Sequence, residues 1–269
     1  MRWTEARERL AAPMFAPLQL ALSRLPSDRW PTHEELTALA GEVRTADGAA
    51  IRFVAPDVLD AGGLYYEKHI ASTGEVPTRD ESWHDLFNAL CWITYPKAKA
   101  AINAQHVAIL DERGDAEARR RGPERDALTL FDEAGVIVAS SDPSLLGLLR
   151  DHEWKTLLWQ RREDVLARMS FFVFGHGTLE QALTPYVGMV AKTVFVPVDD
   201  LFPMLPVEVQ VPRVDALVAA HFSSRARFAS PKTMSPLPVM GVPGWHFAEQ
   251  DEAFYSDTTH FRPRPGNGA

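Results

Sequence analysis

Proline is unevenly distributed along this chain, and its positions restrict the possible fold more than any other feature. Eleven of the 20 prolines lie at or after Pro185. Proline lacks a backbone N–H and its ring clashes with the preceding helical turn, so it is strongly disfavoured in helix interiors and in central strands. Residues 235–246, SPLPVMGVPGWH, therefore cannot form one helix or one central strand over their whole length.

The residues around and after these prolines are rich in aromatic side chains, whereas disordered tails are usually poor in them. We therefore expect a long C-terminal arm that wraps over the rest of the chain, with only residues 265–269 loose. The aromatic residues expected to hold the arm in place are Trp245, Phe247, Phe254, Tyr255 and Phe261.

Helical periodicity is clearest from residue 83 onward. Apolar residues recur at helical spacing in residues 83–93, where Trp83 and Phe87 fall on one face. Pro96 suits the first turn of a second helix, because the missing N–H of proline costs nothing there. The two helices are predicted to form an antiparallel hairpin that turns near Tyr95.

Turn-forming residues outline the remaining elements. A capping-box spacing predicts a helix that begins at Thr32 and uses Glu35. Residues 126–140 are predicted to form strand, turn and strand, because β-branched and aromatic residues flank the turn cluster Asp132–Gly135. The two carboxylates of that cluster are interpreted as turn formers. Further strands are expected at 171–174 and 189–198, and further helices within 142–169 and 211–224.

These elements predict one helix-rich α+β domain with a small antiparallel sheet and a proline-rich C-terminal arm. The main domain is expected over residues 57–264. A helical or irregular lead-in, residues 1–56, would precede it, and the loose tail would follow.

Charge and cysteine content exclude several classes of protein. The chain has 28 basic and 36 acidic residues, a net charge of -8, which disfavours broad nucleic-acid binding. The single cysteine, Cys91, permits no internal disulfide and lies in an apolar segment, so we expect an inert core thiol and a reducing cytoplasm. No run approaches the roughly 18 to 20 apolar residues of a membrane span. We therefore predict a soluble cytoplasmic protein without membrane contact, and its oligomeric state stays open.

Polar residues capable of chemistry gather in the two predicted helices. His84 and Asn88 are spaced i, i+4, so they share a helix face, and the hairpin would place Asn103 and His106 opposite them. Imidazole titrates near neutral pH, and carboxylate and amide oxygens are ordinary metal ligands. The set could bind a divalent metal or transfer protons, or it could be a hydrogen-bonded scaffold or a solvated surface. The candidate catalytic residues here are His84, Asp85, Asn88, Asn103 and His106, and the candidate substrate-binding residues are Lys99 and Arg125.

A second candidate site lies at Gly175–Gly177, between a buried strand and a helix for which Thr178 and Gln181 have capping-box spacing. The glycines allow a ligand to approach the backbone, and a helix start offers unpaired N–H groups to an anion. His176 is therefore a candidate catalytic acid or base, and a plain strand-to-helix turn is the alternative. A nucleophile elbow is excluded, because no serine or cysteine occupies the turn.

Several segments together resemble a known family. They are WHDLFNALCWITYPKAKAAIN, RDALTLFDEAG, GHG with Glu180 shortly after it, and LPVMGVPGW followed by FY and FRPRP. This combination resembles the bacterial family of uncharacterised proteins called domain of unknown function 3025, over about residues 60–264. The resemblance implies no particular activity, cofactor or catalytic residue.

The leading functional hypothesis from the residues is a hydrolase that acts on a phosphorylated or nucleotide-like small molecule. It combines the polar cluster of the helices with a possible anion site at the start of the His176 helix. The alternative is a non-catalytic ligand-binding or protein-interaction scaffold. The sequence leaves open whether a metal or another cofactor is bound.

Overall fold

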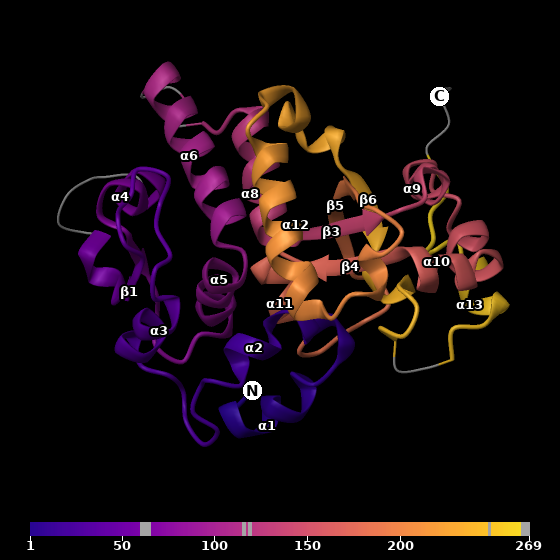
Figure 1. The fold of residues 1–269 in the computed structure, drawn as a ribbon, viewed down its shortest axis with the longest axis horizontal. Helices are drawn as coiled ribbons and strands as arrows, with labels where there is room; N and C mark the ends of the chain where they lie inside the picture. Colours follow the sequence, from indigo (N-terminus) through magenta and orange to yellow (C-terminus); the bar gives the residue numbers. More distant parts are fainter. Residues whose placement is uncertain (60–65, 115–116, 118–119, 247–248, 265–269) are drawn as a thin grey trace.

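The computed structural model describes residues 1–59, 66–114, 117, 120–246 and 249–264. It confirms the helix-rich α+β fold: helices surround a four-stranded sheet, and a smaller two-stranded sheet lies to one side (Figure 1).

The N-terminal residues pack against the helix that carries the first candidate site. The Trp3 ring stacks on the Trp83 ring with centroids 5.3 Å apart, and Phe15 stacks on Phe87 at 5.8 Å. These contacts give residues 1–22 a share of the main hydrophobic core. The helices of this part are α1 (Trp3–Arg9), α2 (Gln19–Leu22) and α3 (His33–Ala40).

The predicted capping box at the start of α3 is confirmed. The Glu35 N–H donates to Thr32 Oγ1 at 3.2 Å, and the Thr32 N–H donates to Glu35 Oε2 at 2.9 Å. Two otherwise unpaired donors are satisfied by this exchange.

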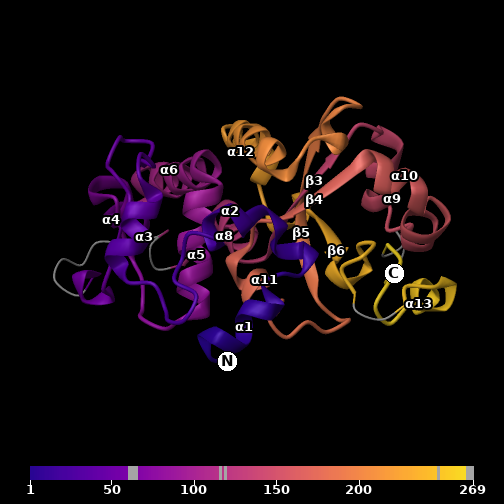
Figure 2. The same cartoon turned by 60° about the horizontal axis from the view of Figure 1, so that its bottom comes forward.

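The two helices predicted around Tyr95 are present, as α5 (Trp83–Thr94) and α6 (Pro96–Arg113). Phe87 is fully buried in the apolar stripe of α5, as its spacing predicts, whereas Ile93 at the end of the stripe is half-buried. The helices do not form the predicted antiparallel hairpin, however. Figures 1 and 2 show α6 leading away from the end of α5 at a steep angle. The polar residues of α5 and α6 therefore approach one another from two helices set at an angle, not from two helices lying side by side.

The main sheet is mixed, with strand order β4-β3-β5-β6. Its outer pairs, β4 with β3 and β5 with β6, are antiparallel, as expected for the predicted sheet, but the central pair β3 and β5 is parallel. Its strands are β3 (Gly135–Ser140), β4 (Met169–Val173), β5 (Val190–Pro197) and β6 (Ser235–Pro238).

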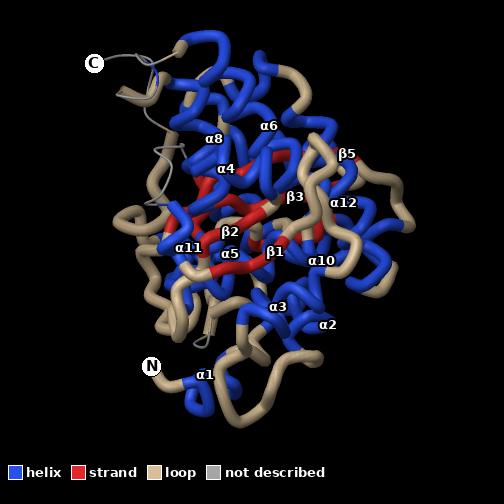
Figure 3. Tube along the Cα trace, turned by 90° about the vertical axis from the view of Figure 1, so that its left-hand side faces the viewer, coloured by secondary structure: helices blue, strands red, loops and turns tan. Residues whose placement is uncertain are grey.

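The smaller sheet joins β1 (Arg52–Val54) and β2 (Glu75–Pro77) in parallel. Figure 3 shows these two strands on the side of the molecule that carries α3, α4 (Tyr66–Thr73) and α5, in front of the main sheet.

Helices cover both faces of the main sheet, so every residue of β3 is buried. Ile137 packs into a core shared with α8 (Pro123–Ala134) and α12 (Val207–Phe222). The next residue, Val138, faces the opposite core, because successive side chains alternate across a strand. The helices on this second side include α9 (Pro143–Arg150) and α10 (Arg162–Arg168).

Residues 126–134 are helical, so the predicted strand and tight turn before β3 are wrong. Pro123 occupies the first turn of α8, where its missing N–H costs nothing. Ala127, Leu128 and Phe131 then fall on one buried face at helical spacing. The β propensity of the threonine and phenylalanine is outweighed by this burial, since propensity depends strongly on context.

The segment after β4 forms the predicted strand-to-helix turn, but the helix begins earlier than expected. α11 (His176–Gln181) has Gly175 as its N-cap, and no side chain caps it. Thr178 is therefore buried inside the first turn, so the predicted capping box with Gln181 is wrong.

The C-terminal arm packs against the domain through its aromatic residues. Tyr255 and Phe261 are buried, and the Tyr255 hydroxyl donates to the Gly241 carbonyl at 2.9 Å. Phe247 and residues 265–269 lie outside the described residues. The proline-rich stretch supplies the edge strand β6, where proline is tolerated. The remaining helices include α4 (Tyr66–Thr73) and α13 (Glu252–Ser256).

Candidate functional site

Both predicted sites open into one polar cavity. It has a volume of about 540 Å³ and lies among α4, α5, α6, α8 and α11. Another cavity, of about 380 Å³, lies beside α2 and α12 and has mainly apolar walls without histidine. The polar cavity brings residues of both predicted sites together, so it is the candidate functional site. Its lining includes Tyr66, Glu67, Arg79, His84, Asp85, Asn88, His106, Arg121, Arg125, Thr129, Asp132, Glu133 and His176.

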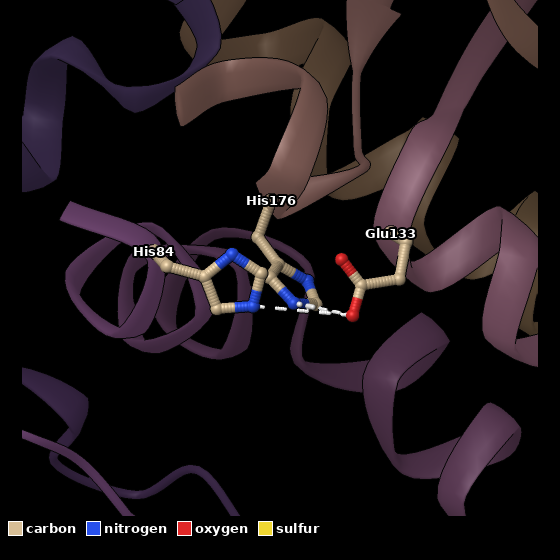
Figure 4. Close-up of side chains that lie close together, drawn as sticks. All are labelled: His84, Glu133 and His176. Atoms are coloured by element: carbon tan, nitrogen blue, oxygen red, sulfur yellow. Dashed lines mark ion pairs between the residues drawn. The ribbon is translucent and has the colours of Figure 1, made fainter. Parts of the chain in front are cut away.

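Three side chains at this cavity form a possible metal centre. His84, Glu133 and His176 each offer a ligand atom, and these atoms lie within 4.8 Å of one another. Glu133 Oε1 is 3.4 Å from His176 Nε2 and 3.9 Å from His84 Nε2 (Figure 4). Tetrahedral zinc with bonds of about 2.0 to 2.1 Å separates its ligand atoms by about 3.3 Å. The separations to Glu133 are therefore close to those of a zinc site.

Helix ends bring these three residues together. His84 lies in the first turn of α5, Glu133 in the last turn of α8, and His176 is the first residue of α11. The Gly175 N–H donates to the Gly135 carbonyl at 2.8 Å. This bond joins the end of α8 to the start of α11, so it places Glu133 beside His176.

A second carboxylate faces the other ring nitrogen of each histidine. His84 Nδ1 lies 3.0 Å from Glu180 Oε2, and His176 Nδ1 lies 3.9 Å from Asp132 Oδ2. Metal-binding histidines usually donate their second N–H to a carboxylate or a carbonyl, which fixes the tautomer and the ring orientation. Both rings thus turn Nε2 toward Glu133 and Nδ1 toward an outer carboxylate.

The pKa values of Glu133 and Asp132, near the end of α8, are both lowered. A hydrogen bond from His176 holds the pKa of Glu133 below its ordinary value. Burial alone would raise the pKa of Asp132, but the Lys99 ammonium, followed by His176, outweighs burial and lowers it. An ionised Glu133 is the form that can bind a cation.

Lys99 is buried rather than exposed to the cavity. Its Nζ lies 2.6 Å from Asp132 Oδ1 and 2.9 Å from Asn88 Oδ1, and 5.4 Å from the centre of the Trp92 ring. Asn88 also donates to the Tyr66 hydroxyl at 3.2 Å. The predicted residues Asn88 and Lys99 are therefore joined to each other and to Asp132.

His106 of α6 lines the opposite wall with Glu67, and Asn103 contacts Glu67 without lining the cavity. Asn103 Nδ2 donates to Glu67 Oε2 at 2.7 Å, and His106 Nε2 lies 4.0 Å from Glu67 Oε1. Burial lowers the pKa of His106, so its ring is neutral at pH 7. Arg125 Nε donates to His106 Nδ1 at 3.3 Å. Among the described residues, Arg125 has no carboxylate ion-pair partner, which leaves positive charge on this wall.

Asp85 lines the cavity, and both of its carboxylate oxygens accept hydrogen bonds from Arg79. The Arg79 Nε and Nη2 atoms donate to Asp85 at 2.8 and 2.9 Å. Burial would raise the pKa of Asp85, but these bonds lower it. The ion pair fixes the loop before α5, since the Arg79 N–H also donates to Asp85 at 2.7 Å.

The sequence prediction placed His84 and His176 in separate sites and missed the acidic residues between them. Because a strand and then a turn at Asp132–Gly135 are predicted there, Asp132 and Glu133 are interpreted as turn formers. A helical reading would have revealed them: Arg125, Thr129 and Asp132 follow one another at i, i+4 and i+7, on one helix face. Glu180, which follows His176 by four residues, offers the same signal.

Cys91 is an inert core residue, as predicted. It is fully buried, its Sγ donates to the Phe174 carbonyl at 3.1 Å, and burial raises the pKa of the thiol to about 12. A thiol with this pKa is not a nucleophile at neutral pH.

No helix in the described part of the chain combines the length and the apolar composition that crossing a membrane requires. No curated protein and no solved structure matches the chain. Residues 51–265 match a family model described as protein of unknown function (DUF3025), which confirms the resemblance seen in the sequence. The chain therefore belongs to this family.

Proposed function

We propose that this protein is a metal-dependent hydrolase that acts on a phosphorylated or nucleotide-like small molecule. The observation that carries the proposal is the triad of His84, Glu133 and His176 at the wall of a polar cavity. Two imidazole nitrogens and one carboxylate oxygen are the ligands of several hydrolytic zinc sites, which keep a further coordination position open.

The donor set fits a divalent ion of the first transition series. Imidazole suits zinc, iron and copper. The one carboxylate gives the three ligands a single negative charge, which attracts a divalent cation. A bound ion would lower the pKa of a coordinated water and so supply a nucleophile at neutral pH. His84, Glu133 and His176 would hold the ion, and Glu180 and Asp132 would orient the two imidazole rings.

The arginine side chains of the opposite wall favour an anionic substrate. Arg125 has no carboxylate partner in the described ranges and is held by His106 and by the Glu117 carbonyl. The guanidinium group matches the geometry of phosphate oxygens. Arg121 also lines the cavity. A volume of about 540 Å³ is suitable for a small molecule.

Metal analysis of the purified protein tests the proposal first. We expect about one divalent ion per chain, bound through the three residues of the triad. His84→Ala, Glu133→Gln and His176→Ala should each lose the ion. His260→Ala, which changes a histidine of another surface, should keep it. Protein that takes up no zinc, manganese or iron after dialysis would refute the metal centre.

Turnover tests the reaction. We expect hydrolysis of one class among phosphomonoesters, phosphodiesters and nucleotides, abolished by a chelator and by Glu133→Gln. Arg125→Gln should raise KM more than it lowers kcat, because it removes a contact to the bound substrate. Metal binding without hydrolysis of any of these substrates would favour the non-catalytic scaffold. Iron with oxygen-dependent turnover would indicate an oxygenase, since two histidines and one carboxylate also bind Fe(II) in such enzymes.

Localisation in the cytoplasm is part of the same proposal. The single thiol, Cys91, is buried and reduced, and such cysteine usage is typical of proteins in a reducing compartment.

A further inference from the structure

Lys99 is a buried ammonium group that does not reach the cavity. Its exposed fraction is only 4%, and it is absent from the cavity lining. Burying a charge is costly unless it is paired and hydrogen-bonded. Lys99 meets this requirement with Asp132 and Asn88, at 2.6 and 2.9 Å, and it lies over the Trp92 ring. A lysine held in this way is poorly placed to contact a substrate directly.

The two oxygens of Asp132 face different partners. Oδ1 accepts from Lys99, and Oδ2 lies 3.9 Å from His176 Nδ1. Among the described residues, His176 Nδ1 is a buried atom without a hydrogen-bond partner. Asp132 Oδ2 is the acceptor near it, and a small movement of the imidazole ring would close the gap. The side chains thus form a chain from Lys99 through Asp132 to His176.

We propose that Lys99 is a positioning residue that fixes the Asp132 carboxylate so that Asp132 orients His176 as a metal ligand. This inference rests on the proposed metal-dependent function. With Lys99 in place, one oxygen of Asp132 is fixed and the other is directed at Nδ1. The Nδ1–H tautomer of His176 then leaves the Nε2 lone pair free for the metal.

The outer carboxylates of His176 and His84 differ in how firmly they are held. Asp132 is braced by buried Lys99, whereas Glu180, the outer carboxylate of His84, has a side chain 45% exposed to solvent. A braced carboxylate loses less freedom when it orients its histidine. Substitution of Asp132 should therefore weaken metal binding more than substitution of Glu180.

A double-mutant cycle on the intact chain tests the role of Lys99. Zinc affinity would be measured by competition with a chromophoric chelator for wild type, Lys99→Met, Asp132→Asn and the double variant. Each single substitution should weaken zinc binding by about 10- to 100-fold, the usual effect of removing such a partner. The double variant should bind no more weakly than Asp132→Asn alone, because Lys99 acts through Asp132.

Further variants separate positioning from general damage. Lys99→Arg keeps the charge and should bind zinc more tightly than Lys99→Met. Glu180→Gln should cost less affinity than Asp132→Asn. Lys192→Met changes a lysine of β5 that does not line the cavity, so it is the matched control and should bind zinc as wild type does. If Lys99→Met fails to fold, the order wild type, Lys99→Arg, Asp132→Asn still has to hold.

Different failures have different meanings. Wild-type protein that binds zinc, together with Lys99→Met of equal affinity, would overturn the role of Lys99 and leave the metal centre intact. Additive losses in the double variant would do the same. Wild-type protein that binds no divalent ion would overturn the proposed function itself, and the role of Lys99 with it.

Discussion

At the scale of single residues, His221 on α12 makes the stability of the fold depend on pH. Burial, reinforced by nearby Arg227, lowers the pKa of this imidazole from 6.5 to about 4. The unfolded chain therefore binds a proton between pH 6.5 and pH 4 that the folded chain does not bind. The contribution of neutral His221 to the free energy of unfolding is therefore fully present above pH 6.5, and it is lost as the pH falls from 6.5 toward 4.

We expect His221→Gln to lose less stability than wild type when the pH is lowered. The free energy of unfolding would be measured in urea at about pH 7 and about pH 5. The difference between the two pH values should be smaller in the variant, because glutamine does not titrate. Equal differences would mean that His221 is protonated in the folded protein over this range.

The triad of His84, Glu133 and His176 shows why a single side chain is a poor guide to function. The side chain of His84 on α5 is 32% exposed, and by itself it resembles an ordinary surface histidine. Its significance depends on Glu133 and His176, which are 49 and 92 positions away in the sequence. The sequence predicted both histidines as chemically active, but only the fold shows that their Nε2 atoms face one carboxylate.

At the scale of elements, the junction of α8, β3 and α11 sets the geometry of the site. Gly175 packs against the backbone of Ala134 and Gly135, and a side chain at Gly175 would overlap both. The close approach lets the Gly175 N–H reach the Gly135 carbonyl. Glycine is thus required here for space, since its φ of -66° is open to any residue.

We expect Gly175→Ala to destabilise the fold by about 1 to 3 kcal/mol, because the added methyl group forces two backbone segments apart. The same shift should separate His176 from Glu133 and weaken zinc binding. Denaturant melts and zinc titration check the two effects. Gly147→Ala is the matched control: it lies in α9 with open space around it, so alanine should leave zinc affinity unchanged and stabilise the helix by up to about 1 kcal/mol. Similar melts for Gly175→Ala and wild type would contradict the packing argument.

Elements with strong local signals were predicted correctly. The capping box of α3, the proline at the start of α6 and the apolar stripe of α5 are each determined by a few neighbouring residues. The prediction failed at 126–134, where the local signals conflict. Asp-Glu-Ala-Gly resembles a turn, and only the burial of Ala127, Leu128 and Phe131 against the sheet selects the helix. That error removed two acidic residues from the predicted site.

At the scale of the whole molecule, composition and periodicity were sufficient for the fold class but not for the arrangement of the elements. The steep angle between α5 and α6 depends on contacts with α12, α4 and α11, which come from distant parts of the sequence. The parallel pairing of β3 with β5 likewise has no local signal, because the two strands are separated by β4. The shared cavity is a product of this long-range packing.

The C-terminal arm is expected to contribute to the stability of the whole domain. It supplies β6, which pairs with β5 over residues Val190–Thr193, and it buries Tyr255 and Phe261 in the main core. Deletion of residues 236–269 would expose the edge of β5 and remove both aromatic rings. We expect a lower melting temperature and a tendency to aggregate, because an uncovered strand edge pairs readily with other chains.

Deletion of residues 265–269 alone is the control, since it removes none of these contacts. Thermal melts and size-exclusion chromatography of the two truncated proteins check the prediction. The cavity lies among α4, α5, α6, α8 and α11, away from the arm. If the protein that lacks residues 236–269 still folds, its zinc affinity should therefore equal that of wild type. A protein without residues 236–269 that melts like wild type would show that β6 and the buried rings add nothing to stability. Loss of zinc binding in a truncated protein with an intact fold would place the arm in the site.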